Sequence, residues 1–254
     1  MTGNLEISNF SLLLSTGLLF IAIFVDYKEK LNLGNDIFIA GLRAVIQLFL
    51  IGYVLSYVIQ LDSMIVTFAM VLFIVFNAGF NAHQRSEGIP KSLFISLSAI
   101  GIGTAVTLSL LVFTGAIDWV PSQIVPITGM IASNAMIALG LTFQTLNSKF
   151  ADQRQQVLEK LTLGATEKQA SMSIIRESVK TGMSPSIDRT KTVGLVSLPG
   201  MMSGLIFAGV DPTEAIRYQI VVMFMLIGVT SIASFIASYL AYREFFNSNK
   251  QLTI

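Results

Sequence analysis

Apolar residues in this 254-residue chain gather into seven long runs that are separated by short polar segments. A helix needs about 20 mostly apolar residues to cross the hydrocarbon core of a bilayer. The runs that approach or exceed this length cover residues 7–25, 37–60, 64–81, 92–115, 124–146, 192–209 and 215–242. The pattern therefore predicts an all-α membrane protein with seven transmembrane helices in a single domain, residues 1–254. Because the third and sixth runs are short, a six-span chain whose sixth run is re-entrant is the alternative.

Composition supports a membrane protein and narrows its chemistry. Charged residues make up 12 % of the chain and the mean hydropathy is +0.72, whereas soluble domains carry about 25 % charged residues. A net charge of +1 gives no reason to expect binding to nucleic acid. With no cysteine and one histidine, His83, the sequence points to no disulfide and to no thiolate or histidine-cluster metal site.

Basic residues follow the odd-numbered runs, which predicts the orientation of the chain. Acidic residues dominate the other connections, where Glu6, Asp62, Asp118, Asp211 and Glu214 stand against Arg217 alone. The basic positions are Lys28, Lys30, Arg85, Lys91, Arg243 and Lys250, with eight more between residues 149 and 191. We therefore expect the N-terminus outside and the C-terminus in the cytoplasm, in the inner (plasma) membrane of a bacterium.

The charged segment 149–191 has helical patterning. Val157, Leu158 and Leu161 form an apolar stripe within residues 152–163. Gly164 is placed to end this helix in a left-handed conformation. The stretch from Thr166 to Gln169 has the spacing of a capping box and predicts the start of a second helix.

The second predicted helix presents Ala170, Ile174, Ile175 and Val179 on one face. We expect it to run to about Met183, where Ser184-Pro185 interrupts it before the next span. The pattern thus predicts a cytoplasmic helix-turn-helix that is stiff, apolar on its inner side and charged outside. Such an element is suited to docking on a partner.

Several long stretches resemble one family of transport proteins. They are "GLRAVIQLFLIGYVL", "VPITGMIASNAMIALGL", "EKLTLGATEKQA", "KTVGLVSLPGMMSGLIFAG" and "AIRYQIVVMFML". Together they resemble the FetB (YbbM) family of ABC transporter permeases, which are regarded as iron exporters. "LGAT" between two helices also resembles the EAA-type coupling region of ABC permeases. In that pattern a Glu stands six residues before the Gly, where this chain has Leu158 and places Glu159 one position later.

The resemblance implies that a separate cytosolic ATPase subunit holds ATP and Mg, and that two permease chains work together. In agreement, the sequence has no G-x-x-x-x-G-K-[ST] motif for nucleotide phosphates. We expect neither catalytic residues nor a cofactor in this chain. The residues expected to couple to the ATPase are Leu158, Glu159, Leu161, Leu163, Gly164, Ala165, Thr166 and Glu167.

The resemblance leaves the cargo open. Iron export is favoured, another metal or a nucleotide sugar is the first alternative, and a non-transporting membrane anchor for an ATPase is the second. Polar residues inside the runs are candidates for the transport pathway, because polar groups in a membrane are costly. They are Arg43, Gln47, Asn77, Asn81 and Asn134.

Each candidate also has a structural interpretation. Arg43 can reach the headgroups with its long side chain, and the amides can bridge helices. The eleven methionines are more simply explained by packing than by a metal pathway. Pro199 with Gly200 predicts a kink or break in the sixth span, and Gly200 with Gly204 forms a small face for close helix contact.

Overall fold

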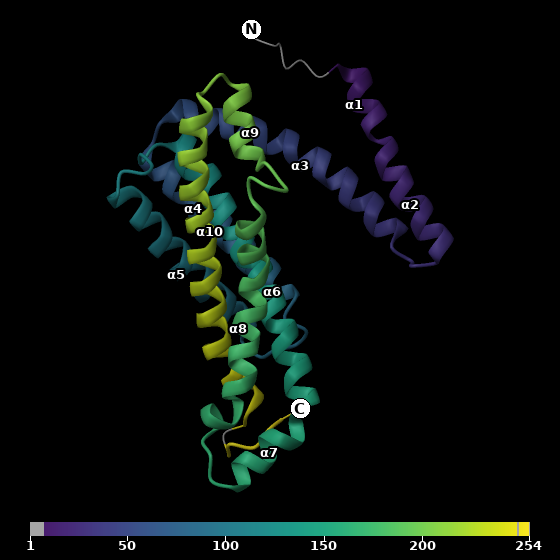
Figure 1. Cartoon of the computed structure of the whole chain (residues 1–254), viewed down its shortest axis with the longest axis vertical. Coiled ribbons are helices and arrows are strands. Elements are labelled where there is room, and N and C mark those ends of the chain that lie inside the picture. Colours follow the sequence, from purple (N-terminus) through teal and green to yellow (C-terminus); the bar gives the residue numbers. More distant parts are fainter. Residues whose placement is uncertain (1–7, 248, 254) are drawn as a thin grey trace. The chain divides into compact units, whose positions relative to one another are not determined.

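The computed structural model describes residues 8–247 and 249–253, and these form an all-helical protein (Figure 1). The chain divides into two compact units, Met1–Asp62 and Ser63–Ile254. Among the described residues, six helical segments are long and apolar enough to cross a membrane. The all-α prediction is confirmed. The described residues contain six candidate spanning segments, whereas the sequence predicted seven.

The first unit contains two of these six segments. Helices α1 (Asn9–Ser15) and α2 (Gly17–Glu29) together form one, and α3 (Gly34–Leu61) forms the next. Helix α2 packs on α3, and the backbone N–H of Leu33 donates to Asp26 Oδ1 at 2.7 Å across the turn. Both predicted spans are present. Residue 7, the first of the first span, and Glu6 before it lie outside the described residues.

The second unit is built around one long helix. Its long apolar helices are α4 (Met64–Gln84), α5 (Ser92–Phe113), α6 (Pro121–Asp152) and α10 (Pro212–Ala241), each close to a predicted span. Helix α6 contacts α4, α5, α10 and also α8. Its inner face carries Leu139, Phe143 and Phe150, which are fully buried. Helix α6 therefore forms the centre of the core.

The segment between α6 and α10 departs from the prediction. It contains α7 (Arg154–Thr162), α8 (Glu167–Thr192) and α9 (Gly200–Phe207). The expected end of the second helix near Met183 is wrong, because α8 continues through Pro185. The expected sixth spanning helix over residues 192–209 is also wrong as one helix. Helix α9 has eight residues and rises roughly 12 Å, less than half the hydrocarbon thickness.

Packing explains why α8 does not stop at Pro185. Its buried face repeats every fourth residue through Ile174, Ser178, Gly182 and Ser186, so the helix is held on both sides of the proline. Pro185 itself is exposed. The backbone hydrogen bond that it removes therefore lies on the outer side of α8, away from the packed core.

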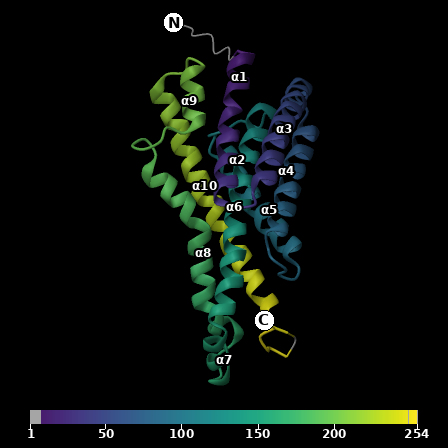
Figure 2. The same cartoon turned by 90° about the vertical axis from the view of Figure 1, so that its right-hand side faces the viewer.

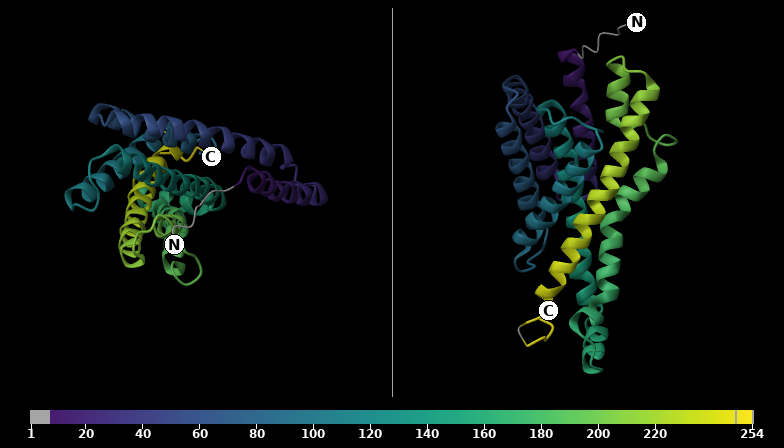
Figure 3. Two further views of the ribbon diagram at one scale, coloured as in Figure 1. Left: turned by 90° about the horizontal axis from the view of Figure 1, so that it is seen from above. Right: turned by 90° about the vertical axis from the view of Figure 1, so that its left-hand side faces the viewer.

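Helices α8 and α9, joined by residues 193–199, follow α10 along the second unit. Helix α7 lies at one end of this unit, and α9 lies at the other end beside the start of α10 (Figures 1 and 2). A side view shows α8 running next to α10 in the opposite direction (Figure 3, right). Residues 192–209, predicted as one spanning helix, are thus divided between the last residue of α8, the link 193–199 and α9.

Gly182 is the point where α8 meets α6 and α10 most closely. A Cβ added there would overlap Thr142 Oγ1 and Ser234 Oγ and would lie 3.0 Å from the carbonyl oxygen of Ala138. The Thr142 hydroxyl already donates to that carbonyl at 2.8 Å, so turning it away would break a buried hydrogen bond. Only glycine allows this approach.

We therefore expect Gly182→Ala to lower the melting temperature of the detergent-purified protein, because overpacking a core costs about 1–3 kcal/mol. Gly129→Ala in α6 is the matched control, since no atom lies within 4 Å of an added Cβ there. It should leave the melting temperature unchanged or raise it, because alanine favours a helix over glycine. Equal melting temperatures for both variants would contradict the close contact.

Candidate functional site

A glycine turn joins α7 to α8 at the end of the second unit. Helix α7 ends at Thr162, and Gly164 has a φ of +90°, a conformation that side chains rarely allow. The N–H of Gly164 donates to the carbonyl of Leu161 and the N–H of Ala165 to that of Lys160, both at 3.0 Å. The predicted glycine stop is confirmed, and we call residues 154–170 the helix–glycine–helix element.

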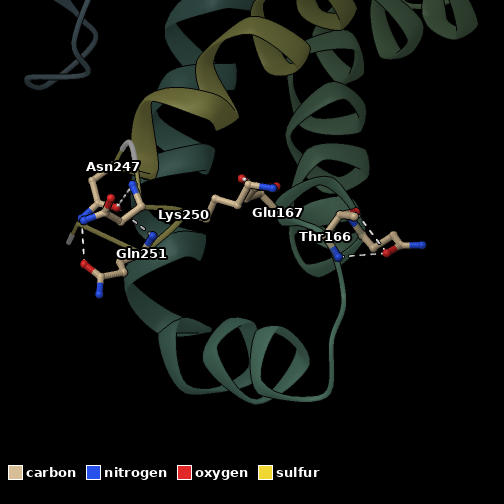
Figure 4. Close-up of polar contacts among 7 residues, drawn as sticks. Thr166, Glu167, Asn247, Lys250 and Gln251 are labelled. Carbon is tan, nitrogen blue, oxygen red and sulfur yellow. Dashed lines mark hydrogen bonds and ion pairs between the residues drawn. The ribbon is translucent and has the colours of Figure 1, made fainter.

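The start of α8 is capped as the sequence predicted. Thr166 Oγ1 accepts from the backbone N–H of Gln169 at 3.3 Å, and Gln169 Oε1 accepts from the N–H of Thr166 at 2.9 Å. Figure 4 shows Thr166 at this cap. These reciprocal bonds satisfy backbone donors that a helix start leaves free, so they hold α8 in line directly after the glycine turn.

The predicted coupling residues divide into two groups. Leu158 and Leu161 pack against the core beside fully buried Val157, and therefore support the element from within. Leu163 lies at the tip and has an exposed fraction of 87 %. Glu159, Gly164 and Thr166 are also exposed, and Ala165 and Glu167 are half-buried. A large apolar side chain projecting from a charged tip is the feature of this element best suited to contact a partner.

Ring stacking and an ion pair hold together the helices that border the element. Phe150, near the end of α6, stacks on Phe245 with ring centres 4.2 Å apart. Lys149 Nζ lies 2.8 Å from Glu177 Oε1 and links α6 to α8. The element itself is anchored to these helices by Val157, Leu158 and Leu161, which pack into the core.

The C-terminal residues fold back toward the same element. After the short 3-10 helix η1 (Tyr242–Phe245), the side chain of Asn247 accepts hydrogen bonds from the backbone of Asn249 and Gln251, each at 2.9 Å. Lys250 Nζ then lies 3.9 Å from Glu167 Oε1 in the first turn of α8 (Figure 4). The chain end thus contributes a further contact to the helix–glycine–helix element.

Charge separates between the two ends of the second unit. An ion pair of 3.0 Å between Lys91 and Glu244 places the α4–α5 turn at the same end as the chain terminus. At the opposite end, Asp211 caps α10 and accepts from the N–H of Thr213 at 2.8 Å. The hydrogen bond from the Thr213 hydroxyl lowers the pKa of Asp211 below its usual value. The α4–α5 turn and the chain terminus therefore share one end of this unit, whereas Arg189, predicted in the same basic group, lies halfway along α6.

The predicted pathway residues lie in different settings. In the described part of α3, Arg43 and Gln47 are exposed and do not bond to each other. Asn81 Nδ2 donates to Asn77 Oδ1 at 2.9 Å, so these amides pair within α4 instead of bridging helices. Among the described residues, Asn134 is the predicted pathway residue that hydrogen-bonds to another helix.

Asn134 forms a hydrogen bond with Arg189, which the sequence pattern placed beyond the expected end of the second helix near Met183. Arg189 Nη1 in α8 donates to Asn134 Oδ1 at 3.1 Å, halfway along α6. The signal that would have located Arg189 is the run of small or apolar residues at every fourth position from Ala170 to Ser186. That run continues the buried face of α8 beyond Pro185 and into the bundle.

A cavity of about 580 Å³ lies beside the link between α8 and α9. Its lining includes Thr190, Gly194, Met202, Met223 and Gln219. Gln219 is 95 % buried, and its Oε1 atom has no hydrogen-bond partner among the described residues. Irregular backbone at membrane depth is tolerated where it is enclosed by protein or lines a polar cavity. Sequence reasoning missed Gln219 because it lies among apolar residues of α10.

The residues predicted as a hinge or packing face border this irregular stretch. Pro199 is the residue before the first turn of α9, and Gly200 is its first residue. The helix is therefore broken here and not merely kinked. An added Cβ at Gly200 or Gly204 would meet no atom within 4 Å, so among the described residues neither glycine forms a close helix contact.

Comparison with known proteins identifies relatives across the whole chain. The chain is 50 % identical over 249 residues to "Probable iron export permease protein FetB" of Escherichia coli, covering 98 % of this chain and 96 % of that protein. It is 38 % identical to "UPF0014 membrane protein STAR2" of rice, covering 94 % and 84 % of the two chains. It is 35 % identical to "Protein ALUMINUM SENSITIVE 3" of Arabidopsis thaliana, covering 91 % and 85 %.

No solved structure matches the chain. Residues 9–246 match the family described as "Uncharacterised protein family (UPF0014)". With most of its length matched and relatives well above 30 % identity, this chain is a member of the UPF0014 family of membrane proteins.

Proposed function

We propose that this chain is the membrane-spanning permease subunit of an ABC transporter that exports iron. A separate cytosolic ATPase with bound ATP and Mg supplies the energy, and two copies of the chain form the pathway. The observation that carries the proposal is the helix–glycine–helix element, with Leu163 exposed at its tip and Leu158 and Leu161 packed behind it.

Helix α8 provides the mechanical connection that such a subunit needs. It has 26 residues and is roughly 39 Å long, and it runs without interruption from the cap at Thr166 to Thr192. Its middle is in close contact with α6 and α10 at Gly182. A displacement of the tip by a docked ATPase would therefore move helices at membrane depth rather than be absorbed by a flexible joint.

The cargo is proposed from likeness to the Escherichia coli relative, whose name specifies iron export. Half of all aligned residues are shared with that protein over nearly the full length of both chains. The alternative cargoes are another metal or a nucleotide sugar. The same transport experiment tests them when they replace iron.

We further propose that α8, the link 193–199 and α9 form the sixth of seven crossings. The basic end of the second unit, which includes α7 and the C-terminus, then lies in the cytoplasm by the positive-inside rule. The acidic end, with Asp118, Asp211 and Glu214, lies outside, as does the N-terminus. Broken helices of this kind occur in transporters where the irregular stretch lines a binding site.

Single cysteines can test this orientation because the chain has none of its own. In spheroplasts, a membrane-impermeant maleimide should label Asp118→Cys and Glu214→Cys, and should label Gln156→Cys in α7 only after permeabilisation. Labelling of residues 156 and 214 from the same side would contradict a sixth crossing between them.

Docking of the ATPase should depend on Leu163. Burial of a leucine at an interface contributes about 1.5–3 kcal/mol, so Leu163→Asp should reduce co-purification of the ATPase at least about tenfold. Gln156→Asp adds the same charge at an exposed position of α7 and should retain the ATPase. Undiminished co-purification with Leu163→Asp would exclude the tip as the docking contact.

Iron transport should be measured in inverted membrane vesicles that contain the chain and its ATPase. We expect ATP-dependent accumulation of iron inside the vesicles, and none when the ATPase carries a substitution in its phosphate-binding lysine. ATP hydrolysis by the complex without iron accumulation would reject iron as the cargo while leaving the ABC assignment intact. Absence of any bound ATPase would reject the assignment itself.

A further inference from the structure

One exposed side of α6 carries polar residues where a lipid-facing helix would be apolar throughout. Ser133, Gln144 and Ser148 recur at helical spacing on this side together with the apolar Ile137, and all four are exposed. The opposite side of α6 forms the core of the second unit. Polar side chains within a membrane face a protein partner or a water-filled path in almost all cases, so this side of α6 is a candidate pathway surface.

Two arginines lie along the edges of this surface, one from each neighbouring helix. On the α8 edge, Arg189 Nη1 donates to Asn134 Oδ1 at 3.1 Å. On the α4 edge, Arg85 covers Gly140, where an added Cβ would lie 3.2 Å from Arg85 Cδ and 3.8 Å from Nη1. Gly140 and Asn134 are six residues apart, so the arginines are offset by roughly 9 Å along the axis of α6.

Glycine at position 140 allows Arg85 to lie flat on α6. A side chain at that position would push against the arginine, whose Cδ would lie 3.2 Å from the added Cβ. The arrangement is further fixed by Asn147 Nδ2, which donates to the carbonyl of Ser86 at 3.0 Å. Arg85 is therefore held beside the polar side of α6 by its backbone as well as by contact.

The positive charge of this surface is not balanced by nearby acids. Among the described residues, neither Arg85 nor Arg189 has a carboxylate within ion-pair distance, and Asp188 pairs instead with Lys191 at 3.7 Å. An arginine at the centre of a membrane costs about 2.5–3.5 kcal/mol on insertion scales. Guanidinium groups present five donors that match carboxylate and phosphate oxygens.

We propose that the arginine-edged surface of α6 binds an oxygen-rich anion, and that the cargo crosses the membrane as such an anion rather than as a bare cation. For iron, this means a complex with a multiply charged carboxylate or phosphate ligand. The two guanidinium groups bind the negative oxygens, while Asn134, Gln144 and Ser133 supply neutral hydrogen bonds between and beside them. This inference rests on the transport function proposed above and specifies the chemical class of its cargo.

Equilibrium binding to the purified chain, with or without its ATPase and in the absence of ATP, tests the proposal separately from transport. The probes are ferric citrate, citrate alone, inorganic phosphate and ferrous iron without a chelator. We expect ferric citrate to bind, and both Arg85→Gln and Arg189→Gln to weaken it at least about tenfold, because each removes a charge-assisted hydrogen-bond donor. Arg176→Gln, which removes an exposed arginine from the same helix as Arg189, should bind as the wild type does.

Further measurements distinguish binding of the anionic complex from binding of unchelated iron and from effects of anionic lipid. Conservative variants serve as controls for misfolding. Arg189→Lys keeps the charge and should retain more affinity than Arg189→Gln, and Gln144→Ala should weaken binding without removing charge. Equal binding by Arg85→Gln, Arg189→Gln and Arg176→Gln would overturn the site. Tighter binding of unchelated iron than of ferric citrate, or loss of arginine dependence once anionic lipid is removed, would overturn the anionic cargo. Failure of ATPase docking alone would leave these binding results standing.

Discussion

Close packing of small residues is the constraint on which the second unit depends. At Gly182 the backbone of α8 approaches Thr142 of α6 and Ser234 of α10 without any room for a side chain. Helices that are surrounded by lipid gain little from apolar surface alone and associate instead through close contact and hydrogen bonds. This contact holds a strongly charged helix against the apolar bundle, and both the tip at Leu163 and the bond from Arg189 follow from its position.

Helix α8 therefore connects the tip of the helix–glycine–helix element to the proposed arginine-edged surface of α6. Gly164 reverses the chain, the Thr166 cap starts α8, and the same helix carries Arg189 to the middle of α6. Ion pairs from Lys149 to Glu177 and from the C-terminal Lys250 to Glu167 hold the first half of α8. In the proposed mechanism, a displacement of the tip is transmitted through continuous helix to the guanidinium group of Arg189 beside α6.

Local patterns predicted the parts of the structure that local forces decide. Apolar runs located five of the seven expected spans as single helices and the first as a helix pair, because burial in lipid needs length and composition alone. The glycine stop and the capping box were predicted residue by residue, since both depend on hydrogen bonds between neighbours in the chain. Pro185 was misread for the same reason: a proline rule considers the neighbouring backbone and ignores the packing that holds α8 on either side of it.

The sequence by itself determined that this is an all-helical membrane protein with a charged helix–glycine–helix element and basic connections after the odd-numbered runs. Only the tertiary structure decided that α8 extends to Thr192, that a link and a short α9 replace the sixth helix, and that Arg85 and Arg189 border the same side of α6. The physical reason is that hydropathy and caps act within a few residues, whereas these features arise from contacts between residues that are 55 and 61 positions apart in the chain.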